Sequence, residues 1–192
     1  MKNADLKKTE YSMICALCIA ISAAVQTAFS SFGSNCAVYF SVLLCAVCCP
    51  LKYGILCAII CPLFAMMTAG EPTVVLLPAG IVKCLSFVLL SRLLLSKFNT
   101  GKIFKDLYIC LVPSVCIGQC ISGLICGTVF CGDADSLILF VVEELIAAIP
   151  EIIFLLAIVP GTVSLLNILG ISDNRLFRRD VLNSDDENRE MN

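Results

Sequence analysis

The sequence predicts an all-α, polytopic membrane protein with six transmembrane helices and no separate soluble domain. Of the 192 residues, 59% are hydrophobic and only 15% are charged, whereas an ordinary soluble domain is about 45–50% apolar. The mean hydropathy is +0.98. Six spans of about 20 residues each would take up most of the chain. A catalytic or nucleotide-binding domain therefore does not fit beside them.

Six apolar stretches lie between short polar breaks, and each is interpreted as one span. They are residues 11–29, 32–49, 53–68, 74–94, 107–130 and 137–159. The last apolar run continues to residue 169, but Pro160-Gly161 is expected to end the span because proline has no backbone N–H to continue the helix. Residues 1–10 then form a basic cytoplasmic flank, residues 11–169 the membrane domain, and residues 170–192 a cytoplasmic, acidic and largely disordered tail.

The positive charges give this arrangement an orientation, because cytoplasmic loops of membrane proteins carry an excess of Lys and Arg. With six spans, all of the 13 Lys and Arg residues except Lys83 fall on one side of the membrane. The loops of the other side carry Glu71, Asp133 and Asp135 instead. Both termini are therefore expected to be cytoplasmic, and the loops holding Asn35, Glu71 and Asp133 external.

Several kinds of chemistry are excluded by what the sequence lacks. It has no His, which removes His-ligated metals and Ser-His or Cys-His nucleophile pairs. It also has no Gly-rich loop ending in Gly-Lys-Ser/Thr. The 14 Cys lie almost entirely inside apolar runs, where they are expected to pack as small apolar residues. No enzyme activity, cofactor or metal is expected, and any uphill transport would draw its energy from a gradient or a partner.

Lys83 lies inside the fourth predicted span, where a charge costs about 2.5–3.5 kcal/mol on insertion scales and needs a partner or a wet cavity. Counted from the outer side at about 1.5 Å per residue, Lys83 is roughly 14 Å deep, and Glu144 and Glu151 are roughly 10 and 21 Å deep in the sixth span. Glu144, Ala147, Ala148 and Glu151 share one helical face, which belongs inside the bundle. The pairing is either a structural link between helices or part of a binding site.

Clustering of polar residues favours the binding site. The fifth span places Gln119, Ser122 and Cys126 on one face, accompanied by glycines at positions 118, 123 and 127. Polar and small residues of three spans thus gather in the outer half of the membrane. Asn35 and Glu71, in the adjoining outer loops, either line the mouth of this site or are ordinary solvated loop residues.

Ala16, Ala20, Ala24 and Ala28 recur at every fourth position of the first span and form a ribbon with little side chain along one helical face. Such faces let two helices approach closely. From the pattern alone, the ribbon either packs within the bundle or docks on another protein.

These features together resemble the substrate-binding S component of energy-coupling factor (ECF) transporters for vitamins. The resemblance covers most of the chain: the basic amino terminus, the Ala ribbon, six spans in under 200 residues and the stretch Pro-Leu-Lys-Tyr-Gly-Ile-Leu-Cys-Ala-Ile-Ile-Cys-Pro-Leu at 50–63. Gly70-Glu71-Pro72 and Leu77-Pro78 follow, where some members read Gly-Met-Pro. One departure is Lys83, at a position where relatives often carry Glu.

The resemblance implies that the chain captures a vitamin or similar micronutrient from outside a bacterial cell. It also implies that Ala16, Ala20 and Ala24 dock on a transmembrane coupling subunit driven by two ATPases. Lys83 in place of Glu favours an anionic ligand, held by Lys83, Glu144, Glu151 and Gln119 with Asn35 and Glu71 nearby. Two other classes remain open: a secondary carrier that works alone, and a membrane scaffold that transports nothing.

Overall fold

The computed structural model describes residues 2–28, 34–70, 72–98, 103–130 and 134–168. Every helix or strand assigned in this part is an α-helix, which confirms the predicted all-α class. The helices are α1 (Lys2–Ala28), α2 (Ser34–Cys48), α3 (Leu51–Ala69), α4 (Leu77–Lys97), α5 (Ile103–Phe130), α6 (Ala134–Ala147) and α7 (Ile149–Ile168). Five of them, α1, α3, α4, α5 and α7, are long and apolar enough to cross a membrane, and α2 contributes a shorter apolar stretch, Cys36–Cys48.

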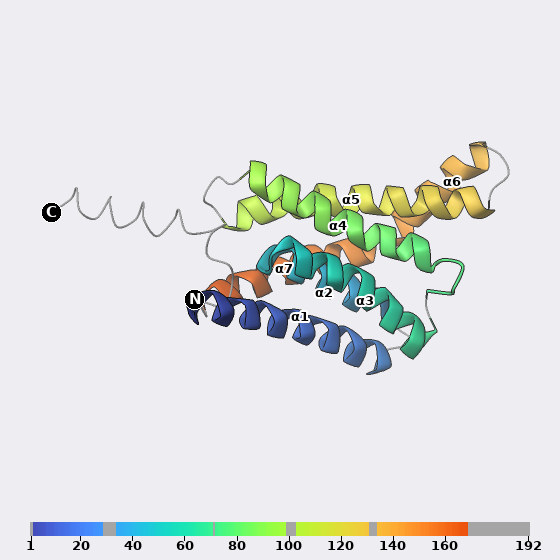
Figure 1. Cartoon of the computed structure of the whole chain (residues 1–192). Coiled ribbons are helices and arrows are strands. Elements are labelled where there is room, and N and C mark those ends of the chain that lie inside the picture. Colours follow the sequence, from blue (N-terminus) through green and yellow to red (C-terminus); the bar gives the residue numbers. More distant parts are fainter. Residues whose placement is uncertain (1, 29–33, 71, 99–102, 131–133, 169–192) are drawn as a thin grey trace, which may run out of the picture.

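The helices run back and forth along one bundle (Figure 1). α1, α3 and α5 run in one direction, α2 and α4 return, and α6 and α7 together make the last return. The beginning of α1 and the end of α7 consequently lie at the same end of the bundle. The predicted tail, residues 170–192, lies outside the described residues.

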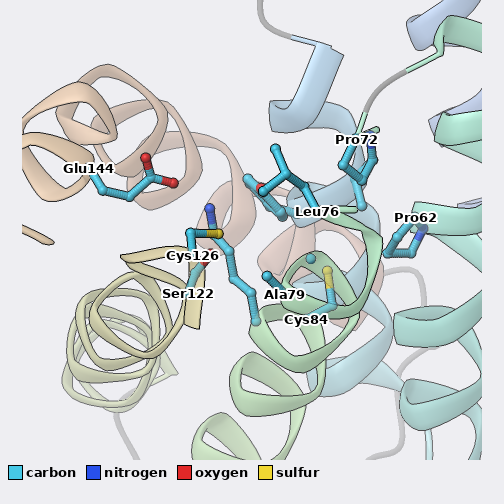
Figure 2. A pocket seen from close by; sticks show the side chains of 12 residues that line it. Pro62, Pro72, Leu76, Ala79, Cys84, Ser122, Cys126 and Glu144 are labelled. Atoms are coloured by element: carbon cyan, nitrogen blue, oxygen red, sulfur yellow. The ribbon is translucent and has the colours of Figure 1, made fainter. Parts of the chain in front are cut away.

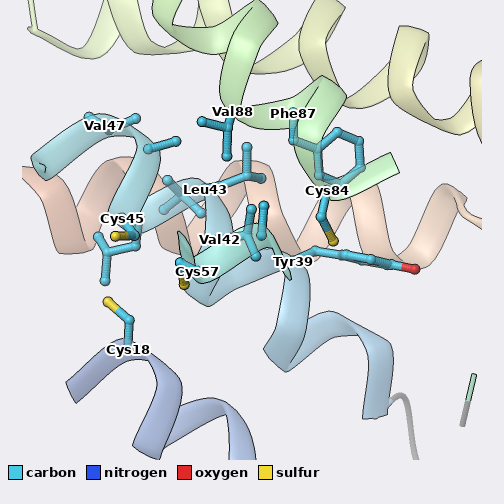
Figure 3. Packing of buried hydrophobic residues seen from close by; sticks show 14 of the residues in the cluster. Cys18, Tyr39, Val42, Leu43, Cys45, Val47, Cys57, Cys84, Phe87 and Val88 are labelled. Atoms are coloured by element: carbon cyan, nitrogen blue, oxygen red, sulfur yellow. The ribbon is translucent and has the colours of Figure 1, made fainter. Parts of the chain in front are cut away.

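α2 occupies the centre of the bundle, where it contacts α1, α3, α4 and α7. All residues from Ser41 to Cys49 are buried, and Val42, Leu43, Cys45 and Ala46 have no exposed surface at all. A helix that is apolar on every side is suited to such a position. Figure 3 shows α2 packed against Cys18 of α1, Cys57 of α3 and Phe87 and Val88 of α4.

Small residues let the helices around α2 approach closely. A Cβ atom added at Gly54 of α3 would come within 2.9 Å of Val88 of α4, and one at Gly118 of α5 would collide with the ring of Phe87. The cysteines of the described residues are free thiols, most of them buried. Several donate weak hydrogen bonds to backbone carbonyls, such as Cys15 Sγ to Tyr53 O at 3.7 Å. The thiols therefore serve as small core residues with a modest polar contact.

The last predicted span differs from the structure at two points. Residues 137–159 do not form one continuous helix, because a turn at Ala148 separates α6 from α7. Pro150 has no N–H for the carbonyl of Ile146, which interrupts the helical hydrogen bonds there. The expected end at Pro160-Gly161 was wrong: α7 continues through Pro160 to Ile168. At Pro160 the loss of one hydrogen bond is tolerated within a helix that is otherwise continuous.

Candidate functional site

A polar chamber lies among α2, α4, α5, α6 and α7. Its volume is about 210 Å³, and it is lined by Tyr39, Lys83, Gln119, Glu144, Ala147, Ala148 and Glu151. Four of the residues predicted as binding residues, Lys83, Gln119, Glu144 and Glu151, therefore line one space. The predicted face of Glu144, Ala147, Ala148 and Glu151 also lines this chamber, even though the helix breaks within it.

A second, smaller cavity of about 130 Å³ adjoins the chamber and shares Tyr39, Lys83 and Glu144 with it. Figure 2 shows Glu144 of α6 pointing across this cavity, with Ser122 and Cys126 of α5 and Ala79 and Cys84 of α4 along its wall. Pro62 of α3 and Pro72 and Leu76, which precede α4, close the opposite side. Ser122 and Cys126 thus contribute to the site, as their shared helical face indicated.

Lys83 lies at the junction of both cavities, with only 5% of its surface exposed. Its Nζ atom is 4.2 Å from the centroid of the Tyr39 ring, which is cation–π geometry. In the described part of the chain, no carboxylate oxygen comes within the 4.0 Å of an ion pair with this ammonium. Glu151 and, more weakly, Glu144 still act on its charge through space. Lys83 is therefore buried, with the carboxyl groups of Glu144 and Glu151 acting on it only from a distance and without a direct salt bridge among the described residues.

Glu144 and Glu151 come from opposite sides of the break between α6 and α7. Glu144 is in the last turn of α6 and Glu151 is in the first turn of α7, and both side chains are half-buried. The neighbouring Glu143 is exposed and lines neither cavity. The break thus leaves both carboxylates on the chamber while each is held by a separate helix.

Gln119 of α5 is the most conspicuous polar residue of the chamber. Its side chain is only 1% exposed, and it lies near enough to the Glu151 carboxyl group for a weak interaction, yet neither its amide nitrogen nor its amide oxygen makes a hydrogen bond of good geometry among the described residues. Leaving a buried polar group unpaired costs about 1–3 kcal/mol. A polar group that enters the chamber could recover this energy.

Other parts of the predicted site are placed differently. Gly118, Gly123 and Gly127 line neither cavity, because they pack against Phe87 of α4 and against Val141 and Leu137 of α6. Asn35 lies in the first turn of α2, and Glu71 lies outside the described residues.

Tyr39 is the residue of this site that the sequence analysis missed. It was one polar ring in an apolar run of the second span. A buried tyrosine usually requires a partner for its hydroxyl group. A tyrosine in an apolar span could therefore have indicated a polar site nearby.

The Ala ribbon lies on the outside of the bundle. Ala16, Ala20 and Ala24 of α1 are all exposed. Ala16 and Ala20 line a shallow groove of about 600 Å³ together with Glu10, Met13, Ile14 and Leu17. These three alanines are therefore not used for close packing against another helix of the described bundle.

A separate apolar groove of about 740 Å³ lies between α1, α2 and α7. Ile21 and Val25 of α1 face Phe154 and Ile158 of α7 across it, and Glu151 and Ala147 border both this groove and the polar chamber. The chamber therefore adjoins an apolar space on the side of α7.

No protein-family model, curated protein or solved structure matches this chain. The class of the protein consequently rests on its own fold and site. The described part of the chain is all-helical, has several helices fit to cross a membrane, and forms a small polar chamber beside an apolar core.

Proposed function

We propose that this chain is the membrane-embedded substrate-capture subunit of an ATP-driven importer of the ECF type, for a vitamin or a related small nutrient. The observation that carries this proposal is the chamber in which Lys83 has no salt bridge and Gln119 has no hydrogen-bond partner among the described residues. If these groups only stabilised the packing of the helices, they would form hydrogen bonds and ion pairs with each other. Groups left unpaired around a cavity are suited to a ligand.

The exposed Ala ribbon supports the second half of the proposal. A transport subunit that lacks a nucleotide-binding motif requires a partner to use ATP, and a face of small residues lets a partner helix approach closely. In this proposal, Ala16, Ala20 and Ala24 contact a transmembrane coupling subunit, and two ATPase subunits hydrolyse ATP. The chain itself is not an enzyme.

The proposal includes six membrane passages with both termini in the cytoplasm of the cell. α2 is the passage that length alone does not support, because its apolar stretch Cys36–Cys48 is shorter than a candidate span, whereas α7 is long enough without α6. The alternating helix directions support an even number of passages (Figure 1). Lys52, Lys97 and Lys105 lie at the end of the bundle where α1 begins, and Asp135 lies in the first turn of α6 at the other end.

This orientation predicts which engineered thiols react from outside the cell. In a background depleted of native thiols, Asp135→Cys should react with a membrane-impermeant maleimide in intact cells. Lys105→Cys should react only after the cells are opened. Both positions are exposed, so burial does not confuse the comparison. Labelling in the reverse order would contradict the proposed orientation.

The docking half of the proposal is tested with Ala20→Trp. The indole should hold a partner helix away from α1, so the variant should lose co-purification with the coupling subunit and nutrient uptake, while the isolated protein still folds and binds. Ala157→Trp provides the matched control, because Ala157 is exposed on α7 away from the ribbon. Unchanged uptake in Ala20→Trp cells would exclude this surface. Uptake by the chain without any ATPase partner would instead identify a secondary carrier.

A further inference from the structure

The charged groups around the chamber are of both signs, and Lys83 is not joined to a carboxylate in a direct ion pair among the described residues. Among the described residues that line the chamber, one carries an ammonium group, Lys83, and two carry carboxyl groups, Glu144 and Glu151. The other polar groups are the unpartnered amide of Gln119 and the ring of Tyr39. The adjoining cavity adds Ser122 and the thiols of Cys84 and Cys126, which bring no further cation.

We propose that the ligand is a small zwitterion, whose anionic group meets Lys83 and whose cationic nitrogen meets Glu144 and Glu151, with Gln119 hydrogen-bonding between them. This inference rests on the proposed function and specifies its substrate class. The three charged side chains come from α4, α6 and α7, so they approach the chamber from different walls. A ligand with two opposite charges in the chamber can therefore face groups of both signs.

A ligand with one charge fits the same groups less well. An anion alone would occupy Lys83 and leave both carboxyl groups without a cation in a mostly apolar surrounding, which is costly. A cation alone would pair with a carboxylate but would add a second positive charge near Lys83 and leave its ammonium without a directly paired anion. A zwitterion brings an anionic group to Lys83 and a cationic group to the two carboxyl groups, and charge-assisted hydrogen bonds of this kind are the strong ones.

The size of the site limits the ligand. The chamber holds about 210 Å³ and the adjoining cavity about 130 Å³, while pockets for drug-sized ligands range over about 300–1,000 Å³. The two adjoining spaces together thus lie at the small end of this range. The charged part of the ligand is therefore compact, with one acidic group and one basic nitrogen, and any larger apolar part would extend toward the groove beside α7.

The proposal is tested with matched probes on the purified full-length protein in detergent micelles. The probes are 6-aminohexanoate, hexanoate and hexylamine, followed by the shorter set 4-aminobutyrate, butyrate and butylamine. Within each set the probes have the same number of carbon atoms, and only their charged end groups differ. Affinity is read from the rise of the unfolding midpoint with probe concentration. Unfolding is followed with a fluorogenic maleimide, because most described cysteines are buried until the protein unfolds.

In the unmodified protein, at least one zwitterion should bind about ten-fold or more tightly than its matched carboxylate and its matched amine. Lys83→Met should lower the affinity for that zwitterion to the level of the amine. The double change Glu144→Gln with Glu151→Gln should lower it to the level of the carboxylate. Gln119→Leu should lower the affinity for the zwitterion with little effect on the order of affinities among the probes. Glu143→Gln, at the exposed neighbour, should change none of these affinities.

Three results would overturn the proposal. Equal binding of the carboxylate and the zwitterion would make the chamber an anion site, equal binding of the amine would make it a cation site, and no stabilisation by any probe would exclude small zwitterions. The comparison of probes in the unmodified protein decides this even where a variant fails to fold. Failure of the proposed function is measured separately, by the Ala20→Trp co-purification experiment, which does not depend on the identity of the ligand.

Discussion

Replacing Lys83 with Met should lower the affinity of the protein for its natural ligand about ten-fold or more and leave the fold intact. Met retains most of the length and the apolar stem of Lys but removes the ammonium group. Losing a charge-assisted hydrogen bond costs about 1.5–3 kcal/mol in binding, and a factor of ten corresponds to about 1.4 kcal/mol. The fold should tolerate the change, because no salt bridge to Lys83 is broken among the described residues.

The effect can be measured by native mass spectrometry of protein purified from cells grown on rich medium, comparing the amount of small molecule that each variant retains. Lys52→Met is a matched control. Lys52 also lies over a tyrosine, with Nζ 5.0 Å from the centroid of the Tyr53 ring, but it is exposed at the start of α3. A stable Lys83→Met protein that retains its ligand as well as the unmodified protein would exclude Lys83 as a ligand contact.

Gly118→Val should produce the largest loss of stability among single changes at the described glycines. The added side chain would meet the ring of Phe87, which is fully buried between α2 and α5 and makes an edge-to-face contact with Tyr39 at 5.5 Å. Overpacking of this kind costs about 1–3 kcal/mol. Since Tyr39 also lines the chamber, displacement of Phe87 should weaken ligand binding as well. Thermal unfolding of the detergent-solubilised protein measures the loss.

Gly161→Val controls for the intrinsic effect of replacing a helical glycine. Gly161 is exposed in α7, and an added Cβ atom has nothing within 4 Å. Its unfolding midpoint should therefore stay close to that of the unmodified protein. Phe87→Leu provides a second check, because the smaller side chain should make Gly118→Val less costly in the double variant than in the single one. Equal losses at Gly118 and Gly161 would show that the contact with Phe87 is unimportant.

The sequence carried enough information to predict the all-α class and four polar residues that line the chamber, but not the division of the last apolar run into α6 and α7. Lys83, Gln119, Glu144 and Glu151 could be found because a charged or amide side chain in an apolar run is conspicuous, and because helix geometry gives its depth and face. The same reasoning did not reveal Tyr39. A tyrosine in an apolar run was a signal, but its contacts with Lys83 and Phe87 depend on the packing of α2 against α4 and could not be predicted from the local sequence.

The break between α6 and α7 could not be located from the sequence for a related reason. Pro150 and Pro160 each remove one backbone hydrogen bond, and local chemistry treats them alike. Their surroundings differ, because Pro160 is buried against the bundle whereas Pro150 is exposed beside the apolar groove. Tertiary contacts therefore decide which proline interrupts the helix.

The central position of α2 has a consequence for the order in which the protein is assembled. α2 is synthesised second, but one of the helices that cover it, α7, is synthesised last. Its 15 residues give a length of about 22 Å, shorter than the roughly 30 Å of a bilayer core. Until α7 is complete, one side of this short helix faces lipid at a cost of hydrophobic mismatch. Among the helix pairs in contact in the described bundle, α2 and α7 are thus the farthest apart in sequence. A chain that ended before residue 149 would lack α7 and leave one side of α2 uncovered.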